Sequence, residues 1–434
     1  MKEWVQRMRF TGPLALSIMA MPFSIALCHF ALGLFMVSWL TSGHWKEKWK
    51  LMHTNYIVAI FLLFFFLHLA GVIYSQDKHT AWFALEKKAS LFLLPMMIAS
   101  IKLEKEHFNK LLHVFIITCL IATFICLGAA LHKAYLTSAT FNFDSYTNTS
   151  FYSFNPTASS IWMFLSYIEL ASGIGIHPVY LSLYLSFCIV LIINFYDSSF
   201  AEFTITKRII LAIIILYLVL FLLFLSSRIM ILALLLIMIY GLNQFLKKEP
   251  RLIVWGSSFV LTLFLIGIIY LNPVSRYRSY QEIVSTWPYQ KTGLQVESTT
   301  IRASLWSLSV QSLSKINLLI GTGTGDVEHV ISESAKDANI TNVLGTNDPH
   351  NQYLQTLLGL GILGLTCLLI CFAWPAWSSY LNGNFLYLGF IFLFSILCLT
   401  ETAMELQKGI VFYSLLGPLI LFHNKPVNFS QETA

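Results

Sequence analysis

The sequence predicts an all-α polytopic membrane protein with about twelve transmembrane helices and a large, partly helical loop on the outer face. Of its 434 residues, 57% are apolar or aromatic and only 11% are charged, and the mean hydropathy of +0.70 excludes an ordinary soluble domain. The apolar residues form continuous runs rather than the alternating ten-mers of an outer-membrane barrel. These runs recur to the end of the chain, which also excludes a soluble enzyme with a cleavable signal.

Most of the predicted spans are clear from length alone, since a crossing takes about 20 mostly apolar residues. The clear runs are Tyr56 to Tyr74, Leu111 to Leu131, Val179 to Phe195, Ile209 to Leu225, Ile229 to Leu246, Leu252 to Leu271 and Asn351 to Ala373. Weaker runs are Trp82 to Ile101, Phe385 to Thr400 and Ile410 to Phe422. The first run, Leu14 to Leu40, contains Pro22, so it is either one kinked helix or two short ones.

Basic residues divide the connections into two sets. Fifteen Lys and Arg residues lie in alternate connections: Lys2, Arg7, Arg9, Lys46, Lys48, Lys50, Lys102, Lys105, Lys110, Lys207, Arg208, Lys247, Lys248, Arg251 and Lys425. The other short connections hold only Lys78, Lys133, Arg228 and Lys408. By the positive-inside rule the first set is cytoplasmic, and both chain ends lie inside only if the first run crosses twice. Twelve spans follow.

This topology predicts three parts of the chain: residues 1–271 with about nine spans, a periplasmic loop at 272–350, and residues 351–434 with about three spans. The loop has 79 residues with six basic and seven acidic side chains, which is too long for an idle connection. A second outer segment, Lys133 to His177, is rich in Asn, Ser, Thr and Tyr.

The sequence gives little support for a metal, a cofactor or a nucleic acid as a ligand. All seven cysteines fall inside apolar runs, where they are typical small hydrophobes rather than disulfides or metal ligands. No His, Cys and Asp cluster has metal-ligand spacing, so we expect neither a metal nor a cofactor. The net charge of +6 would suit nucleic acid in a soluble protein, but here it follows the membrane sides, and we expect membrane lipids as partners and no nucleic acid.

His350 is the leading catalytic candidate. It stands where the long outer loop enters a span, with Pro349 suited to a first helical turn and Asp348 or Asn347 to an N-cap. The positive end of that helix disfavours imidazolium, and a neutral histidine at the outer surface suits a general base. The alternative is a histidine of the capping turn with no chemistry.

Two arginines are candidate anion ligands. Arg228 follows two serines in the short link between two apolar spans, where it either snorkels to the headgroups or holds an anion such as phosphate. Arg302 lies four residues before Trp306 in a helical stretch of the outer loop, which also permits a structural cation–π pair. The glycines from Gly321 to Gly325 predict a tight turn, because the Lys-Ser/Thr of a nucleotide loop is missing.

Further polar residues lie near the outer face. His177 and Tyr180 open a span from the outside, and Lys87 and Lys88 sit in the outer half of a weak span, where they either snorkel or contact phosphate. The candidates come from separate parts of the chain yet share one face, which favours a site. A transporter or flippase would instead gather its polar groups near the bilayer midplane.

Taken in order, these motifs resemble the O-antigen ligase and polymerase superfamily. They comprise Ser227-Arg228 at the start of a span, Arg302 to Trp306 followed by Gly321 to Asp326, then His350-Asn351, Tyr353-Leu354-Gln355 and Gly361 to Leu365. The likeness is strongest over Leu211 to Ala373. Family members often carry an acidic residue where this chain has Gly359.

The resemblance implies a GT-C-like bundle in the bacterial inner membrane that moves a glycan en bloc from undecaprenyl diphosphate to a hydroxyl acceptor at the periplasmic face. In the ligase branch the acceptor is the lipid A core; a polymerase and a protein O-oligosaccharyltransferase share every motif. Carried over, Arg228 and Arg302 bind the diphosphate and His350 activates or orients the hydroxyl. We add Lys87, Lys88, His177, Tyr180, Asn351 and Tyr353 as expected substrate contacts.

Overall fold

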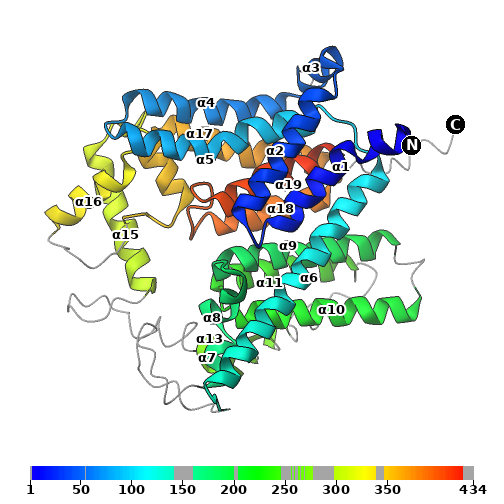
Figure 1. The fold of residues 1–434 in the computed structure, drawn as a ribbon. Coiled ribbons are helices and arrows are strands. Elements are labelled where there is room, and N and C mark those ends of the chain that lie inside the picture. The colour runs from blue at the N-terminus through cyan, green and yellow to red at the C-terminus, as the bar shows by residue number, and fades with distance from the viewer. Residues whose placement is uncertain are drawn as a thin grey trace. The chain divides into compact units, whose positions relative to one another are not determined.

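The computed structural model describes residues 2–53, 55–140, 160–199, 204–245, 298–338 and 347–423, together with parts of 256–276. Within these ranges the regular structure is helical, and the one β-type contact is an isolated bridge between Thr140 and Ser160 (Figure 1). The predicted all-α class is therefore confirmed for this part of the chain.

The chain divides into two compact units, Met1–Val114 with Ile301–Ala434, and Phe115–Thr300. The first unit contains α1 (Lys2–Ala20), α2 (Ile25–Thr41), α3 (Trp45–His53), α4 (Tyr56–Tyr74), α5 (Lys78–Ala99), α16 (Val327–Asp337), α17 (Gln352–Leu381), α18 (Phe385–Leu397) and α19 (Gln407–His423). The second contains α7 (Ile161–Phe164), α8 (Tyr167–Ala171), α9 (Pro178–Ser199), α10 (Ile205–Phe224), α11 (Arg228–Phe245) and α13 (Pro273–Arg276). The unit boundaries fall within α6 (Lys105–Leu136) and α15 (Ser298–Ser312). Our division at residues 271 and 350 follows the membrane and stays a prediction.

The first apolar run forms two helices rather than one. α1 ends at Ala20 and α2 begins at Ile25, and Ser24 caps α2 by accepting the Leu27 N–H through Oγ at 3.2 Å. The proline at 22 lies in this break, as its lack of an N–H favours. α1 and α2 pack against each other, so the run turns back on itself.

The core of the first unit is built by α4, α5, α17 and α19. α5 packs on both α4 and α19, and α4 also packs on α17 (Figure 1). Stacked rings fill the contact between the last helices, with Phe394 and Tyr413 4.7 Å apart between centroids. Close van der Waals packing of this kind stabilises helix contacts in a bilayer, where the hydrophobic effect does not drive helices together.

Two connections that we expect in the cytoplasm lie together at one end of this unit. Lys102, after α5, pairs with Glu47 of α3 at 2.6 Å. Lys48 is buried over the rings of Trp39 and Trp45 and donates to the Trp39 carbonyl. At the same end, Trp39 donates to Ser100 Oγ at 2.7 Å. This arrangement agrees with a common side for both basic clusters.

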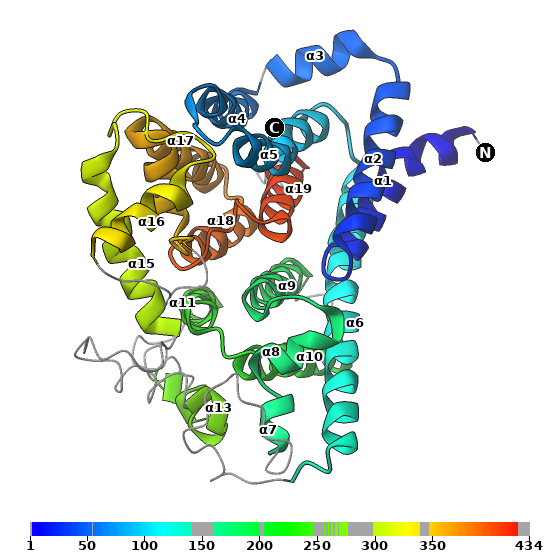
Figure 2. The same ribbon diagram turned by 60° about the vertical axis from the view of Figure 1, so that its left-hand side comes forward.

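Part of the large loop folds onto α17. α15 and α16 lie beside α17 (Figure 2). One buried apolar cluster joins the three helices through Leu305, Leu308, Val327, Ile331 and Leu358. The expected partly helical loop is thus helical at 298–312 and 327–337. Its packing gives α17 a fixed support next to the candidate residues.

The described residues contain some of the twelve predicted spans. Among the described residues, α4, α6, α9, α10 and α17 are long and apolar enough to cross a membrane, and the bent pair α2 and α3 makes six if it counts as one span. α18 has 13 residues and α19 has 17, and the run Leu252 to Leu271 lies partly outside the described residues. The total of twelve stays a prediction.

Candidate functional site

The glycine run forms a backbone clamp between α4 and α17. The Thr322 and Gly323 N–H groups donate to the carbonyls of Leu358 and Gly359 at 2.9 and 2.8 Å. Gly321 and Gly323 have φ values of +74° and +110°, in the region that favours glycine. A Cβ at either position would lie within 2.6 Å of neighbouring atoms. The expected tight turn is present, and its role is structural.

The backbone of α17 departs from helical geometry close to this clamp. Gly361 leaves helical geometry at φ 64° and ψ −161°, and the Ile362 and Leu363 N–H groups turn to the carbonyls of Leu318 and Leu319 at 2.8 and 3.2 Å. A Cβ at Gly359 would meet Cγ2 of Val327 at 3.2 Å, so a larger side chain at this position requires a shift of the valine.

The start of α17 corrects one expectation. The N-cap is Asn351, not Asp348 or Asn347, since its Oδ1 accepts the N–H groups of Tyr353 and Leu354 at 3.0 and 3.1 Å. Asp348 instead accepts the His350 N–H at 2.8 Å and the Thr402 hydroxyl at 2.7 Å. His350 therefore precedes the helix by two residues, and the first turn does not contain Pro349.

His350 has an unusual backbone. Its φ of 46° lies in the left-handed region, which is uncommon outside glycine and costs about 1–3 kcal/mol at most sites. Such strain persists where the surroundings hold the residue in place, and it is concentrated at functional sites. Here the Asp348 carboxylate holds the backbone from one side.

A single buried carboxylate joins His350 to Arg302. Oε1 of Glu401 accepts from Arg302 Nη2 at 2.5 Å, and its Oε2 lies 3.5 Å from His350 Nδ1. The Glu401 side chain is 6% exposed, whereas Arg302 and His350 are 27% and 31% exposed. Two residues 48 positions apart, both predicted from the sequence, are thus brought to one carboxylate, and both of these partners reach solvent.

The electrostatics of His350 differ from our expectation. The Glu401 carboxylate raises the pKa of His350 above its usual value, against the opposing effect of burial, and Asp348 adds to the increase. We expected the helix end to lower it. The neighbouring carboxylate dominates because the helix effect is confined to the first turn, and His350 lies outside that turn.

Further buried polar atoms lie on neighbouring residues. Within the described residues, Trp306 Nε1, Gln355 Oε1 and Thr400 Oγ1 are buried without a hydrogen-bond partner. Trp306 lies one turn after Arg302 in α15, Gln355 one turn after Asn351, and Thr400 beside Glu401. Buried polar groups are normally satisfied, and exceptions tend to mark functional positions.

Lys88 and Lys87 differ in their surroundings. Lys88 is 1% exposed and pairs with Glu405, which also approaches Gln352 Nε2 at 3.4 Å. It neither snorkels nor reaches the surface. Lys87 is half-buried, with its ammonium 4.4 Å from the centre of the Phe83 ring. Substrate contact by either lysine stays a prediction.

Asn351 and Tyr353 fasten the start of α17 to the end of α18. Asn351 Nδ2 donates to the Leu399 carbonyl at 3.0 Å, and the Tyr353 hydroxyl donates to the Ser395 carbonyl at 2.9 Å. These contacts give both residues a positioning role. A direct substrate contact by either side chain remains a prediction.

The remaining candidates belong to the second unit. Arg228 is the first residue of α11 and is half-buried, and the link before it is held by Ser226 Oγ, 2.8 Å from Ser275 Oγ. His177 is exposed just before α9 and accepts the Val179 N–H at 3.4 Å, while Tyr180 is buried. The short Ser-Ser turn into a span is as expected.

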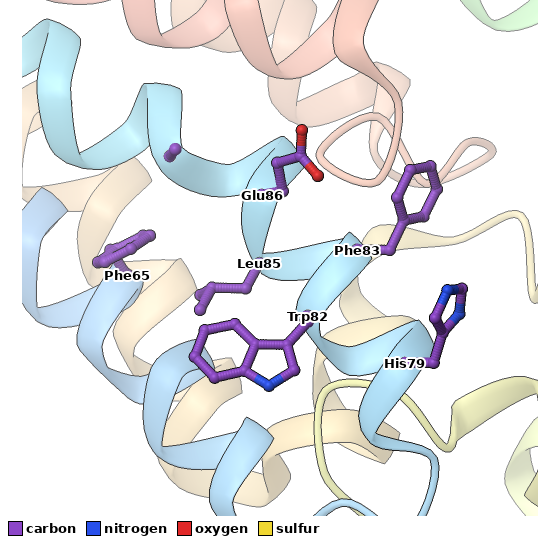
Figure 3. A pocket seen from close by; sticks show the side chains of 7 residues that line it. Phe65, His79, Trp82, Phe83, Leu85 and Glu86 are labelled. Carbon is purple, nitrogen blue, oxygen red and sulfur yellow. The ribbon is translucent and has the colours of Figure 1, made fainter.

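A groove of about 520 Å³ lies along α5 in the first unit. It is lined by Phe65, His79, Trp82, Phe83, Leu85, Glu86 and Ala89. Figure 3 shows Trp82 and Leu85 on the side of Phe65. The lining suits a hydrocarbon chain better than a diphosphate, and it does not include the Glu401 cluster. No group of three or more His, Cys, Asp or Glu side chains is arranged for a metal ion within the described residues.

The sequence reading missed Glu401 and Glu405. Both lie in the short link between α18 and α19, which the topology places outside. The signal was available, because two acidic residues four positions apart in a link between apolar runs need cationic partners.

Comparison with known proteins identifies one family. Residues 211–369 match the family described as O-Antigen ligase. This range contains Arg228, Arg302 and His350, and it nearly coincides with the stretch where the motifs were recognised. No curated protein matches the chain. The resemblance to the O-antigen ligase superfamily is confirmed by the match.

Proposed function

We propose that this multi-pass membrane protein, with its O-antigen ligase domain at residues 211–369, transfers a glycan en bloc from undecaprenyl diphosphate to a hydroxyl acceptor. The acceptor we favour is the lipid A core, at the periplasmic face of the bacterial inner membrane. A polymerase or a protein O-oligosaccharyltransferase remains the alternative within the same superfamily. The observation that carries the proposal is the joining of Arg302 and His350 through Glu401.

The chemistry fits those side chains. A lipid diphosphate is a good leaving group, so the enzyme has to neutralise developing negative charge and position the nucleophile. Arg302 offers a planar fork that matches two phosphate oxygens, and its partial exposure lets an anion approach. Arg228 has the same chemistry at the start of α11, and its role rests on the family motif. Neither arginine needs a metal ion.

His350 supplies the other half of the reaction. In its neutral form it accepts the proton of the acceptor hydroxyl as oxygen bonds to the anomeric carbon. The bond between that carbon and the diphosphate breaks, and its electron pair leaves with the diphosphate. A single displacement of this kind inverts the anomeric centre.

The product of transfer distinguishes a ligase from a polymerase. Deletion of the gene in its source bacterium should leave full-length chains on the carrier if the protein is a ligase. Single repeats on lipid A core indicate a polymerase instead. The purified protein should transfer a carrier-linked glycan to lipid A core, and failure with this acceptor, a second carrier-linked repeat and a protein acceptor overturns the proposal.

The orientation has its own test. We predict that Lys105 faces the cytoplasm and that His329, an exposed residue of α16, faces outward. Single cysteines at these positions, in a cysteine-free background, are treated with an impermeant maleimide in cells with a permeable outer membrane. Labelling at position 329 alone is expected, and labelling at position 105 contradicts the topology.

A further inference from the structure

We propose that Glu401 is the positioning residue of the transfer reaction, holding His350 with Nδ1 toward its carboxylate and Nε2 toward the acceptor hydroxyl. This inference rests on the proposed function. One carboxylate oxygen is given to Arg302 and the other to His350, so the group that would bind the donor and the group that would act on the acceptor share one support.

The link that carries Glu401 is fixed to the start of α17 on both sides of the glutamate. Before it, the Gln352 N–H donates to the Cys398 carbonyl at 2.8 Å. After it, the Thr402 hydroxyl donates to Asp348, and the Met404 N–H donates to Gln352 Oε1 at 2.8 Å. Because these bonds reach the residues on either side of His350, Glu401 and His350 are held by one rigid network.

Burial makes the two partners of Glu401 necessary. A carboxylate that is 6% exposed is costly unless it is paired and hydrogen-bonded. Arg302 already donates to this carboxylate, whereas His350 Nδ1 lies 3.5 Å from it and, within the described residues, makes no hydrogen bond. Catalytic hydrogen bonds that are long or poorly aligned in a free enzyme commonly form or tighten when substrate binds. A diphosphate that draws Arg302 toward itself would leave more of the Glu401 charge for His350.

The charges that face His350 come from three elements. Glu401 lies in the α18–α19 link, Asp348 in the loop before α17, and Arg302 on α15. The two carboxylates raise the pKa of His350 and Arg302 lowers it. Glu401 therefore favours the tautomer that carries its proton on Nδ1, which leaves the Nε2 lone pair for the incoming hydroxyl.

The proton balance follows from that tautomer. The acceptor hydroxyl gives its proton to Nε2 as its oxygen forms the new glycosidic bond, and the electron pair of the broken bond leaves on the diphosphate. His350 is then an imidazolium whose charge Glu401 compensates. The proton returns to solvent or to the diphosphate before the next turnover.

The decisive variant is Glu401→Gln in the full-length, purified protein. We expect kcat to fall by about 10-fold or more, though by no more than His350→Ala lowers it, because the carboxylate sets the tautomer of the base histidine and acts through it. The change in KM for the carrier-linked donor should be smaller. In the wild type the transfer rate should rise with pH as His350 loses its proton, which gives the pH–rate profile an acidic limb. Without the carboxylate that raises the His350 pKa, this acidic limb should move to lower pH in Glu401→Gln.

Two matched controls separate orientation from loss of a charge. Glu405→Gln removes a second acid from the same link, and Asp337→Asn removes an exposed partner of Lys315. Both should keep the wild-type pH profile. In a His350→Ala background, Glu401→Gln should cost at most a few-fold, because it acts through the histidine. An additive loss, or an unchanged acidic limb, overturns the proposal and leaves Glu401 as a structural partner of Arg302.

A second variant and a second measurement keep the test independent of folding and of the substrate. Glu401→Asp keeps the carboxylate but moves it about one methylene away from His350 and Arg302. The transfer rate of this variant should therefore fall, while the acidic limb of its pH–rate profile stays near that of the wild type. A wild-type transfer rate in Glu401→Asp contradicts the proposal. His350 can also be titrated by NMR in histidine-labelled protein, with His350→Asn to assign the signal. A lower midpoint in Glu401→Gln supports the coupling even if the wild type shows no transfer, in which case only the proposed function fails.

Discussion

Two glutamates four residues apart in the α18–α19 link differ in which partner of each pair is buried. Glu401 is 6% exposed while its partners Arg302 and His350 are 27% and 31% exposed. In the second pair the cation is hidden, since Lys88 is 1% exposed and Glu405 is 19% exposed. A cation that reaches solvent can exchange its carboxylate for a substrate anion. A buried cation cannot, so the first pair suits binding and the second suits stability.

The largest effect should come from breaking the second pair. Glu405→Ala leaves Lys88 buried without its carboxylate, and removing one partner of a buried pair costs about 3–5 kcal/mol. We expect a lower apparent Tm in detergent and less folded protein, with turnover per folded molecule retained. Adding Lys88→Met should recover much of the loss. A Lys88→Met protein with normal Tm and impaired donor binding would instead support a phosphate contact.

The next effect concerns His350. His350→Ala should slow transfer by roughly 10²-fold or more, the usual scale of general-base catalysis, while donor binding stays near wild type. His350→Asn cannot accept a proton and should be similarly slow in a transfer assay. A near-normal rate with an unchanged pH profile in the Asn variant would argue for positioning alone. Loss of membrane expression in both variants would point to a structural role.

Replacing either arginine with lysine should slow glycan transfer less than replacing His350 does. Arg302→Lys and Arg228→Lys keep the charge but lose the fork that grips two oxygens, so we expect about a 10-fold loss of transfer or more in folded protein. Donor binding and single-turnover rates measure it. Full transfer by Arg228→Lys would indicate a headgroup anchor, and full transfer by Arg302→Lys would make its pairing with Glu401 merely structural.

The smallest effect is on the pH dependence of stability. Because the folded state raises the pKa of His350, protonation of this residue favours folding. Its contribution is complete below the unfolded pKa and is lost as the pH rises through the folded pKa. The difference in Tm between wild type and His350→Ala, measured across that range, should shrink as the pH increases. A difference that is independent of pH would contradict the coupling to Glu401.

Hydropathy was enough to predict the helical membrane class, and the order of the charges predicts an outer position for the candidate motifs, which stays a prediction. The reason is that a bilayer demands long apolar helices whatever their partners. The glycine turn at 321–325 and the short serine link before Arg228 were also readable, because their backbone requirements are local. The family motifs added the expectation that Arg302 and His350 act in one reaction.

Only the tertiary structure decided what those residues face. Glu401 and Glu405 are 99 and 317 positions from the cations they hold, and no local pattern relates such distant residues. The same holds for Asn351 as the cap of α17, since Asp348 is occupied by Thr402 from a distant link. The raised pKa of His350 follows from that packing. A sequence states which charges a chain carries, whereas the fold decides which of them are paired, buried or left accessible to a substrate.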